Sequence, residues 1–175
     1  MSGPTYHLWF EPTGEAHDIL ARTIREIAPE LGGPVFEPHV SLIGNLDGTE
    51  EEIVDRTSEL GRSLQPVTIT LAEPSYRDEH FRCLFMLAKP DRNLMNAYAV
   101  ASDRFRKPRE DFMPHLSLAY GSASEAQKKS IIQELPREVR MTFEVATISL
   151  IRADSLAPKD WHGAGRFPMN GNQSR

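Results

Sequence analysis

A five-residue motif that occurs twice constrains this chain more than any other feature. The segment 38–42 (PHVSL) recurs as the segment 114–118 (PHLSL), with four identities and one conservative aliphatic change. The two copies lie 76 residues apart, close to half of the 175-residue chain. Chance repetition of a given pentapeptide at this level has a probability of about 1 in 100 or less. The repeat therefore predicts two similar halves, each carrying one copy.

Both copies are predicted to be strands that the chain enters through a proline. Side chains at positions i and i+2 of a strand share a face, so His39 and Ser41 point the same way while Val40 faces the core. His115 and Ser117 repeat this arrangement. If an approximate two-fold axis relates the halves, the motifs line one groove and present two imidazoles and two hydroxyls to a single ligand.

This set of side chains suits the hydrolysis of a cyclic phosphodiester. Two histidines with ordinary pKa values near ~6.5 can act as base and acid near neutral pH. One deprotonates water and the other protonates the leaving alkoxide, while serine hydroxyls can donate hydrogen bonds to the non-bridging phosphate oxygens. The motifs supply each of these parts, and the reaction they predict needs no metal.

Other readings of the motif have less support. A lone histidine on a strand is more often structural than catalytic, but two in matched motifs favour a function. Histidine is a common metal ligand, yet serine is a poor one and the repeat contributes no carboxylate or cysteine. A serine nucleophile needs an orienting acid and an oxyanion hole, and neither has a signature here. The single cysteine, Cys83, cannot form an intrachain disulfide.

The remaining pattern predicts a mixed α+β chain without a low-complexity linker. We expect strands at 5–10, 36–44, 67–71, 81–88, 114–120, 141–151 and 161–169, and helices at 15–29, 50–63, 93–105 and 125–135. Thr49 followed by Glu52 is a capping-box signature for the second helix. We interpret residues 1–169 as one domain of two lobes, with motifs at 39–41 and 115–117, and residues 170–175 as a polar tail.

Charge and hydropathy exclude several classes of partner. Twenty Lys and Arg stand against 25 Asp and Glu, so the formal net charge is −5. This argues against a broad basic face for long nucleic acid, although it leaves room for a small anionic ligand. No apolar run approaches 18 residues and the first residues lack the layout of a signal peptide. We expect a cytoplasmic protein that does not bind membranes, and a monomer.

The two motifs resemble those of the two-histidine (2H) phosphoesterase superfamily, which carries paired His-x-Thr/Ser motifs on strands of two similar lobes. Segments 33–41 and 113–120 are similar to the two motif regions of the plant and yeast type cyclic phosphodiesterases. Segment 6–9 is similar to their opening strand and segment 81–83 to their aromatic-x-Cys strand. The resemblance implies an α+β, bilobal, duplicated fold in which antiparallel or mixed sheets face a central groove and helices lie outside.

The resemblance also implies an activity. It is the opening of ADP-ribose 1″,2″-cyclic phosphate to the 1″-phosphate, and of nucleoside 2′,3′-cyclic phosphates to 2′-phosphates. His39 and His115 would be the acid/base pair, in either order, and Ser41 and Ser117 would hold the phosphoryl oxygens. Tyr120 occupies the position of a family tyrosine near the phosphate. In a regular strand its side chain would point to the face away from that of His115. It therefore enters the groove only if the strand ends or bulges first.

Trp9 and Phe81 match family positions that flank the nucleoside, although both fit equally well as ordinary core aromatics. The resemblance implies no cofactor and no metal, and a small cyclic phosphate as the partner. Two alternatives stay open. One is an RNA 2′,3′-cyclic phosphodiesterase or 2′-5′ RNA ligase that acts on RNA ends in RNA processing. The other is a non-catalytic module that binds nucleotides or RNA ends, against which the two intact histidines count.

Overall fold

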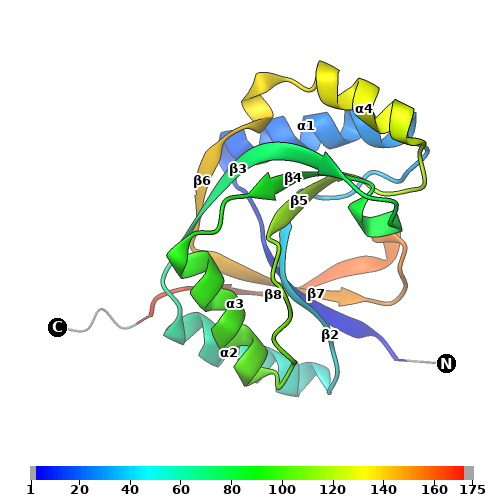
Figure 1. Cartoon of the computed structure of the whole chain (residues 1–175). Coiled ribbons are helices and arrows are strands. Elements are labelled where there is room, and N and C mark those ends of the chain that lie inside the picture. Colours follow the sequence, from blue (N-terminus) through cyan, green and yellow to red (C-terminus); the bar gives the residue numbers. More distant parts are fainter. Residues whose placement is uncertain (1–2, 172–175) are drawn as a thin grey trace.

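The computed structural model describes residues 3–171 of the chain (Figure 1). Its strands are β1 (Thr5–Phe10), β2 (Val40–Leu46), β3 (Val67–Tyr76), β4 (Leu84–Ala88), β5 (His115–Ala119), β6 (Thr142–Val145), β7 (Thr147–Ala153) and β8 (Trp161–Pro168). Its helices are α1 (Gly14–Glu30), α2 (Glu50–Ser63), α3 (Arg92–Arg104) and α4 (Glu125–Glu134), with short 3₁₀ turns η1 (His80–Arg82), η2 (Arg137–Val139) and η3 (Pro158–Asp160).

The eight strands form one antiparallel sheet in the order β6-β3-β4-β5-β2-β1-β7-β8. This order divides the sheet into two four-stranded halves that join where β2 pairs with β5. The sheet is curled, so the two halves face each other while the helices lie outside (Figure 1). The predicted α+β class with two facing sheet halves is confirmed.

Each half of the sheet is covered by helices from both halves of the chain. Helix α1 contacts β5 and α4 contacts β3, while α2 contacts β7 and β8, and α3 contacts β2 and β3. Figure 1 shows α1 beside α4 and α2 beside α3. The amphipathic pattern of α1 explains its docking, because Leu20, Ile24 and Ile27 are buried at helical spacing. The predicted capping box is present at the start of α2, where Thr49 and Glu52 bond reciprocally.

Four predicted strands differ from the structure, the first being the strand expected over 67–71, which continues to Tyr76 as β3. The strand expected over 36–44 begins only at Val40, and residues 80–82 form η1 rather than part of the strand expected over 81–88. The long strand expected over 141–151 is two strands separated at Ala146. Strand β6 pairs with β3 at one edge of the sheet and β7 pairs with β1 and β8 in the other half. A continuous apolar run cannot show that its two parts have different partners.

The C-terminal end of the described chain returns to α2. The backbone amide of Asn170 donates to the Gly61 carbonyl, and that of Gly171 donates to the Leu64 carbonyl. Residues 172–175 of the predicted polar tail lie outside the described residues. Within residues 3–171, none of the helices combines the length and apolar character needed to cross a membrane.

Candidate active site

The first motif lies where the chain enters β2. The His39 side chain is only 6% exposed, and its Nδ1 donates a hydrogen bond to the Glu37 carbonyl at 2.8 Å. Because a carbonyl oxygen can only accept, this bond places the ring proton on Nδ1 and leaves Nε2 free to accept one. The Trp9 ring stacks on the imidazole, with centroids 3.5 Å apart and planes 7° apart. Ser41 is exposed, and its hydroxyl has no hydrogen-bond partner within residues 3–171.

The second motif has the same histidine geometry. His115 begins β5, and its Nδ1 donates to the Met113 carbonyl at 2.9 Å, which again leaves Nε2 free. Its imidazole is half-buried and meets the edge of the Phe85 ring at 5.1 Å between centroids. Ser117 is buried, unlike Ser41, and its hydroxyl donates to the Phe81 carbonyl at 3.1 Å.

The sheet register brings the two motifs together. Val40 on β2 pairs with Leu116 on β5 in antiparallel register. Extending this register by one residue on either side sets His39, which directly precedes β2, opposite Ser117, and Ser41 opposite His115. Side chains directly opposite each other on one face of an antiparallel pair are within contact range, with Cβ atoms about 4.5–5.5 Å apart. The predicted groups therefore lie as one square at the seam between the halves of the sheet.

Burial keeps both imidazoles neutral in the protein without substrate. Loss of solvation lowers the pKa of His39 to about 4, partly opposed by its bond to the Glu37 carbonyl. The proximity of His115 lowers the pKa of His39 further. The pKa of His115 is also lowered, first by burial and then by the positive charges of Arg82 and Arg77. Each ring thus carries one proton, on Nδ1, near pH 7.

Tyr120 reaches the site because β5 ends at Ala119, before strand parity can turn its side chain away. Its ring is buried and stacks on Phe36, with centroids 3.9 Å apart. Burial raises the pKa of Tyr120, and the neighbouring Ser117 hydroxyl opposes this in part, so the phenol stays protonated. A Cβ on Gly33 would lie 1.9 Å from the Tyr120 carbonyl oxygen, so only glycine allows the chain before the first motif to pass here.

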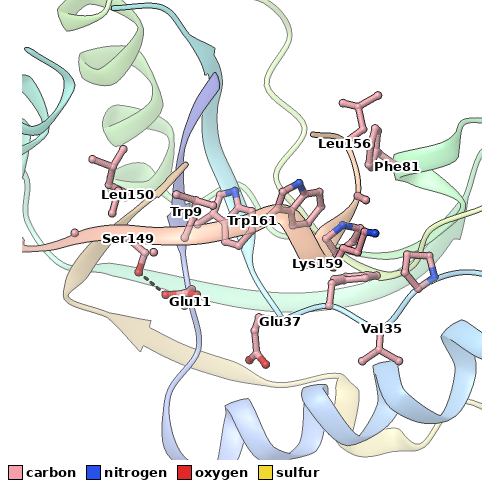
Figure 2. Close-up of a pocket in the computed structure, with 18 of the residues that line it drawn as sticks. Trp9, Glu11, Val35, Glu37, Phe81, Ser149, Leu150, Leu156, Lys159 and Trp161 are labelled. Carbon is pink, nitrogen blue, oxygen red and sulfur yellow. Dashed lines mark hydrogen bonds between the residues drawn. The ribbon is translucent and has the colours of Figure 1, made fainter. Parts of the chain in front are cut away.

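A cavity of about 1430 Å³ lies beside Trp9, the residue that stacks on His39 (Figure 2). Its lining includes Trp9 and Phe81, the two aromatics expected to flank a nucleoside, together with Trp161. His39 and His115 are not among the described residues that line it. His39 lies behind one lining residue, because Trp9 stacks on its imidazole, and Ser117 donates to the backbone carbonyl of another, Phe81. The cavity is therefore a space beside the reactive groups and does not itself contain them.

Comparison with known proteins identifies the family of the chain. A sequence model described as the 2′-5′ RNA ligase superfamily matches residues 14–156 of the chain. The chain belongs to this superfamily. The prediction of a two-histidine phosphoesterase is thereby confirmed at the level of the family.

Individual relatives are more distant. The chain is 27% identical over 126 residues to a protein of Arabidopsis thaliana named cyclic phosphodiesterase, a match that covers 71% of this chain and 70% of the relative. It is also similar to the crystal structure of Escherichia coli LigT in apo form, with a TM-score of 0.68, 18% identity and coverage of 98% and 100% of the two chains. A protein of Thermus thermophilus has a TM-score of 0.66 and 20% identity over 97% and 100%. These two structures show that the fold is shared.

Two side chains near the two motifs had no predicted role. Trp161 lies 6.3 Å from His39 and 5.5 Å from Trp9 between ring centroids, yet the sequence indicated only an edge strand there. The sequence did contain one signal. Trp161 stands in a segment with glycine at 163 and 165, which lacks the alternating apolar residues that would indicate a core position for the tryptophan. His7 is two residues before Trp9 on β1, and its proximity lowers the pKa of His39. No motif marked it.

Proposed function

We propose that the protein is a metal-independent cyclic phosphodiesterase that uses His39 and His115 as a general acid/base pair. The observation that carries the proposal is the register between β2 and β5, which sets both histidines and both serines of the repeated motif on one face. Within residues 3–171 neither Nε2 atom has a hydrogen-bond partner, and each Nδ1 is bound to a backbone carbonyl two residues earlier. One square of side chains thus offers a base, an acid and hydroxyl donors.

The proposed reaction needs two proton transfers. One neutral imidazole accepts a proton from water at Nε2 while the water oxygen forms a bond to phosphorus. The bond from phosphorus to the 3′-oxygen of the nucleoside 2′,3′-cyclic phosphate breaks, and the second imidazole, protonated at Nε2, gives its proton to that oxygen. The product is a 2′-phosphate. At the end the first imidazole is protonated at Nε2 and the second is neutral. General acid catalysis and general base catalysis each increase the reaction rate by about 10²–10⁴-fold.

The serines and Tyr120 are proposed to hold the phosphoryl oxygens. The Ser41 hydroxyl, which has no partner among the residues that the structure describes, can donate to the phosphate directly. The Ser117 hydroxyl already donates to the Phe81 carbonyl, so it must rotate away from this carbonyl when the phosphate binds. The Tyr120 phenol, protonated and close to Ser117, can compensate as a donor.

We propose nucleoside 2′,3′-cyclic phosphates and ADP-ribose 1″,2″-cyclic phosphate as substrates. Support comes from the name of the Arabidopsis relative, cyclic phosphodiesterase, and from the aromatic lining of the cavity beside the histidines. Crystal structures of LigT, which shares the fold, are of complexes with 3′-AMP, ATP and NADP⁺. Trp9 and Phe81 are proposed to flank the nucleoside.

A second candidate is action on RNA that ends in a 2′,3′-cyclic phosphate, or 2′-5′ RNA ligation. The family description, 2′-5′ RNA ligase superfamily, favours it. The net charge of −5 counts against an extended RNA-binding face.

The test is an assay of the purified protein in excess chelator with a mononucleoside 2′,3′-cyclic phosphate, ADP-ribose 1″,2″-cyclic phosphate and a short RNA with a cyclic end. We expect turnover of the two small substrates to the 2′- and 1″-phosphates, identified by ³¹P NMR. Turnover confined to the RNA would support the second candidate. Binding of all three without turnover would establish a non-catalytic module instead.

A further inference from the structure

The square of motif side chains holds little positive charge for the group it is proposed to bind. The two imidazoles share one proton before and after the reaction, and Ser41, Ser117 and Tyr120 are neutral donors. Between the two proton transfers the phosphoryl group carries a second negative charge. The phosphate monoester product also becomes a dianion above its second pKa of about 6. A fixed cation beside the phosphoryl group would stabilise this added charge.

Arg77 directs its side chain toward the second motif. It directly follows β3, and its Nη2 donates to the Met113 sulfur at 3.7 Å. Met113 is also the residue whose carbonyl accepts the hydrogen bond from Nδ1 of His115. The guanidinium therefore lies beside the residue that fixes the ring of His115.

The sheet register shows the path that this side chain takes. The last residue of β3 pairs with Leu84, and Leu84 pairs with Ala119, at the end of β5 opposite to His115. Arg77 thus starts beyond one end of β5, whereas Met113 precedes the other end. Contact between these two side chains brings the guanidinium along β5 toward His115. The charge of Arg77 accordingly lowers the pKa of His115.

The main chain of Arg77 is fixed although its side chain is exposed. Its amide donates to the Arg82 carbonyl at 2.9 Å, and its carbonyl accepts from Nζ of Lys128 at 2.8 Å. Lys128 belongs to α4 and is only 3% exposed. A buried lysine thus anchors the position from which the arginine extends, which reduces the ordering cost of binding an anion there.

The guanidinium of Arg77 is available to a ligand. It forms no ion pair within residues 3–171, and the thioether that it contacts is a weak acceptor. Arg82, the other arginine that acts on His115, lies 3.6 Å from the Glu79 carboxylate, which acts on His115 with the opposite sign. A guanidinium matches the oxygens of a phosphate better than it matches sulfur.

We propose that Arg77 is a further catalytic residue, which turns from Met113 to bind a non-bridging oxygen of the phosphoryl group. Its charge stabilises the second negative charge of the transition state and of the product. Arg77 transfers no proton and forms no covalent bond, so the roles of the two histidines do not change. The inference rests on the proposed function and adds a cation to that site.

The kinetic test compares Arg77→Met with wild type on a mononucleoside 2′,3′-cyclic phosphate. We expect kcat to fall by about 10–100-fold, the loss of one charge-assisted hydrogen bond. KM should change less than kcat, because the added charge arises in the transition state. Arg77→Lys keeps the charge and should recover part of the loss. Arg62→Met, at an exposed arginine in the last turn of α2, is the matched control and should remain within twofold.

Two readouts distinguish binding of the phosphoryl group from a merely structural role. Guanidinium ion, added far below the concentration that unfolds proteins, should restore part of the activity of Arg77→Ala and should not raise that of wild type. Loss of Arg77 also removes a charge that lowers the pKa of His115, while Arg82 and Glu79 remain. The fall of kcat/KM at high pH should therefore begin at a higher pH in Arg77→Met.

Binding of the product can be followed without catalysis through the fluorescence of Trp9, which stacks on His39. We expect Arg77→Met to raise the Kd of adenosine 2′-phosphate about tenfold and to leave the Kd of adenosine unchanged. An unchanged kcat together with an unchanged Kd for the 2′-phosphate would overturn the proposal. A larger loss of kcat in the double variant Arg82→Met/Glu79→Gln than in Arg77→Met would also overturn it. Absence of turnover by wild type would reject the proposed function, and the two Kd values would then test Arg77 alone.

Discussion

The two copies of the motif have nearly the same sequence but different surroundings. In the first copy the histidine is buried under Trp9 and the serine is exposed. In the second the serine is buried against the Phe81 carbonyl and the histidine is more open. The antiparallel register then places His39 opposite Ser117, on a closed side of the square, and Ser41 opposite His115, on an open side. Duplication repeats the chemical groups, whereas the sheet decides the environment of each.

The aromatic residues reinforce this difference. The closed side lies against Trp9, Phe36 and Tyr120, which stack on one another or on His39. The open side is nearer the charges of Arg77 and Arg82, which act on His115. A substrate phosphate that enters from the open side therefore meets Ser41 and His115 first. Substitutions on each side test whether the two differ in this way.

The largest expected effect is common to both sides. His39→Gln and His115→Gln should each lower kcat/KM for a 2′,3′-cyclic phosphate by about 10²–10⁴-fold, because each removes one proton-transfer group. His162→Gln, on exposed β8, should remain within twofold and serves as the control. Full activity in either motif variant would show that the two histidines are not a pair.

The next effect separates the histidines by stability. The pKa of His39 is about 4 when folded and near 6.5 when unfolded, so the unfolded state binds more protons between these values. The stabilisation from a neutral His39 is fully present above pH 6.5 and falls as the pH is lowered toward 4. By pH 5 we expect a loss of about 2 kcal/mol in the free energy of unfolding.

Urea unfolding at pH 7.5 and pH 5 measures this loss, and His39→Gln should lack it. His115→Gln should abolish only the contribution of His115, which has the same sign. Identical pH dependence in wild type and His39→Gln would contradict the buried environment assigned to this ring.

The pH dependence of turnover tests the pair as a unit. The reaction needs one neutral and one protonated imidazole, and both pKa values lie below 6.5 in the free protein. We expect kcat/KM to be maximal on the acidic side of pH 6.5 and to fall about tenfold per pH unit at higher pH. A maximum above pH 7 would show that neither ring is as strongly desolvated as its burial implies.

The smallest effect distinguishes the serines. Ser117→Ala removes the bond to the Phe81 carbonyl and should lower the free energy of unfolding by about 1 kcal/mol, while Ser41→Ala should leave it unchanged. Both should lower kcat/KM, since each removes a phosphate donor. Equal stability of the two variants in urea would contradict the division into closed and open sides.

Much of this site follows from the sequence, because local pattern determines it. The strand-forming residues of 5–10, the capping box at Thr49 and the repeated motif each predict what the structure contains. The partners of a strand do not follow from its own residues, so the division at Ala146 was not predicted. The same limit applies to Trp161 and Leu156, which reach the cavity only because β7, β8 and their loop fold beside β1.

The exchange of helices between the halves has a consequence for the order of assembly. Helix α1 follows β1 in one half of the sheet but covers β5 in the other, and α3 follows β4 but contacts β2 of the other half as well as β3. A cut at the midpoint would therefore strip each sheet half of one of its covering helices. During synthesis, neither half of the sheet can be completed before the chain has crossed the junction between β2 and β5 more than once. We expect the two motifs to meet only in the last cooperative step of folding, and fragments of the chain to complement each other poorly.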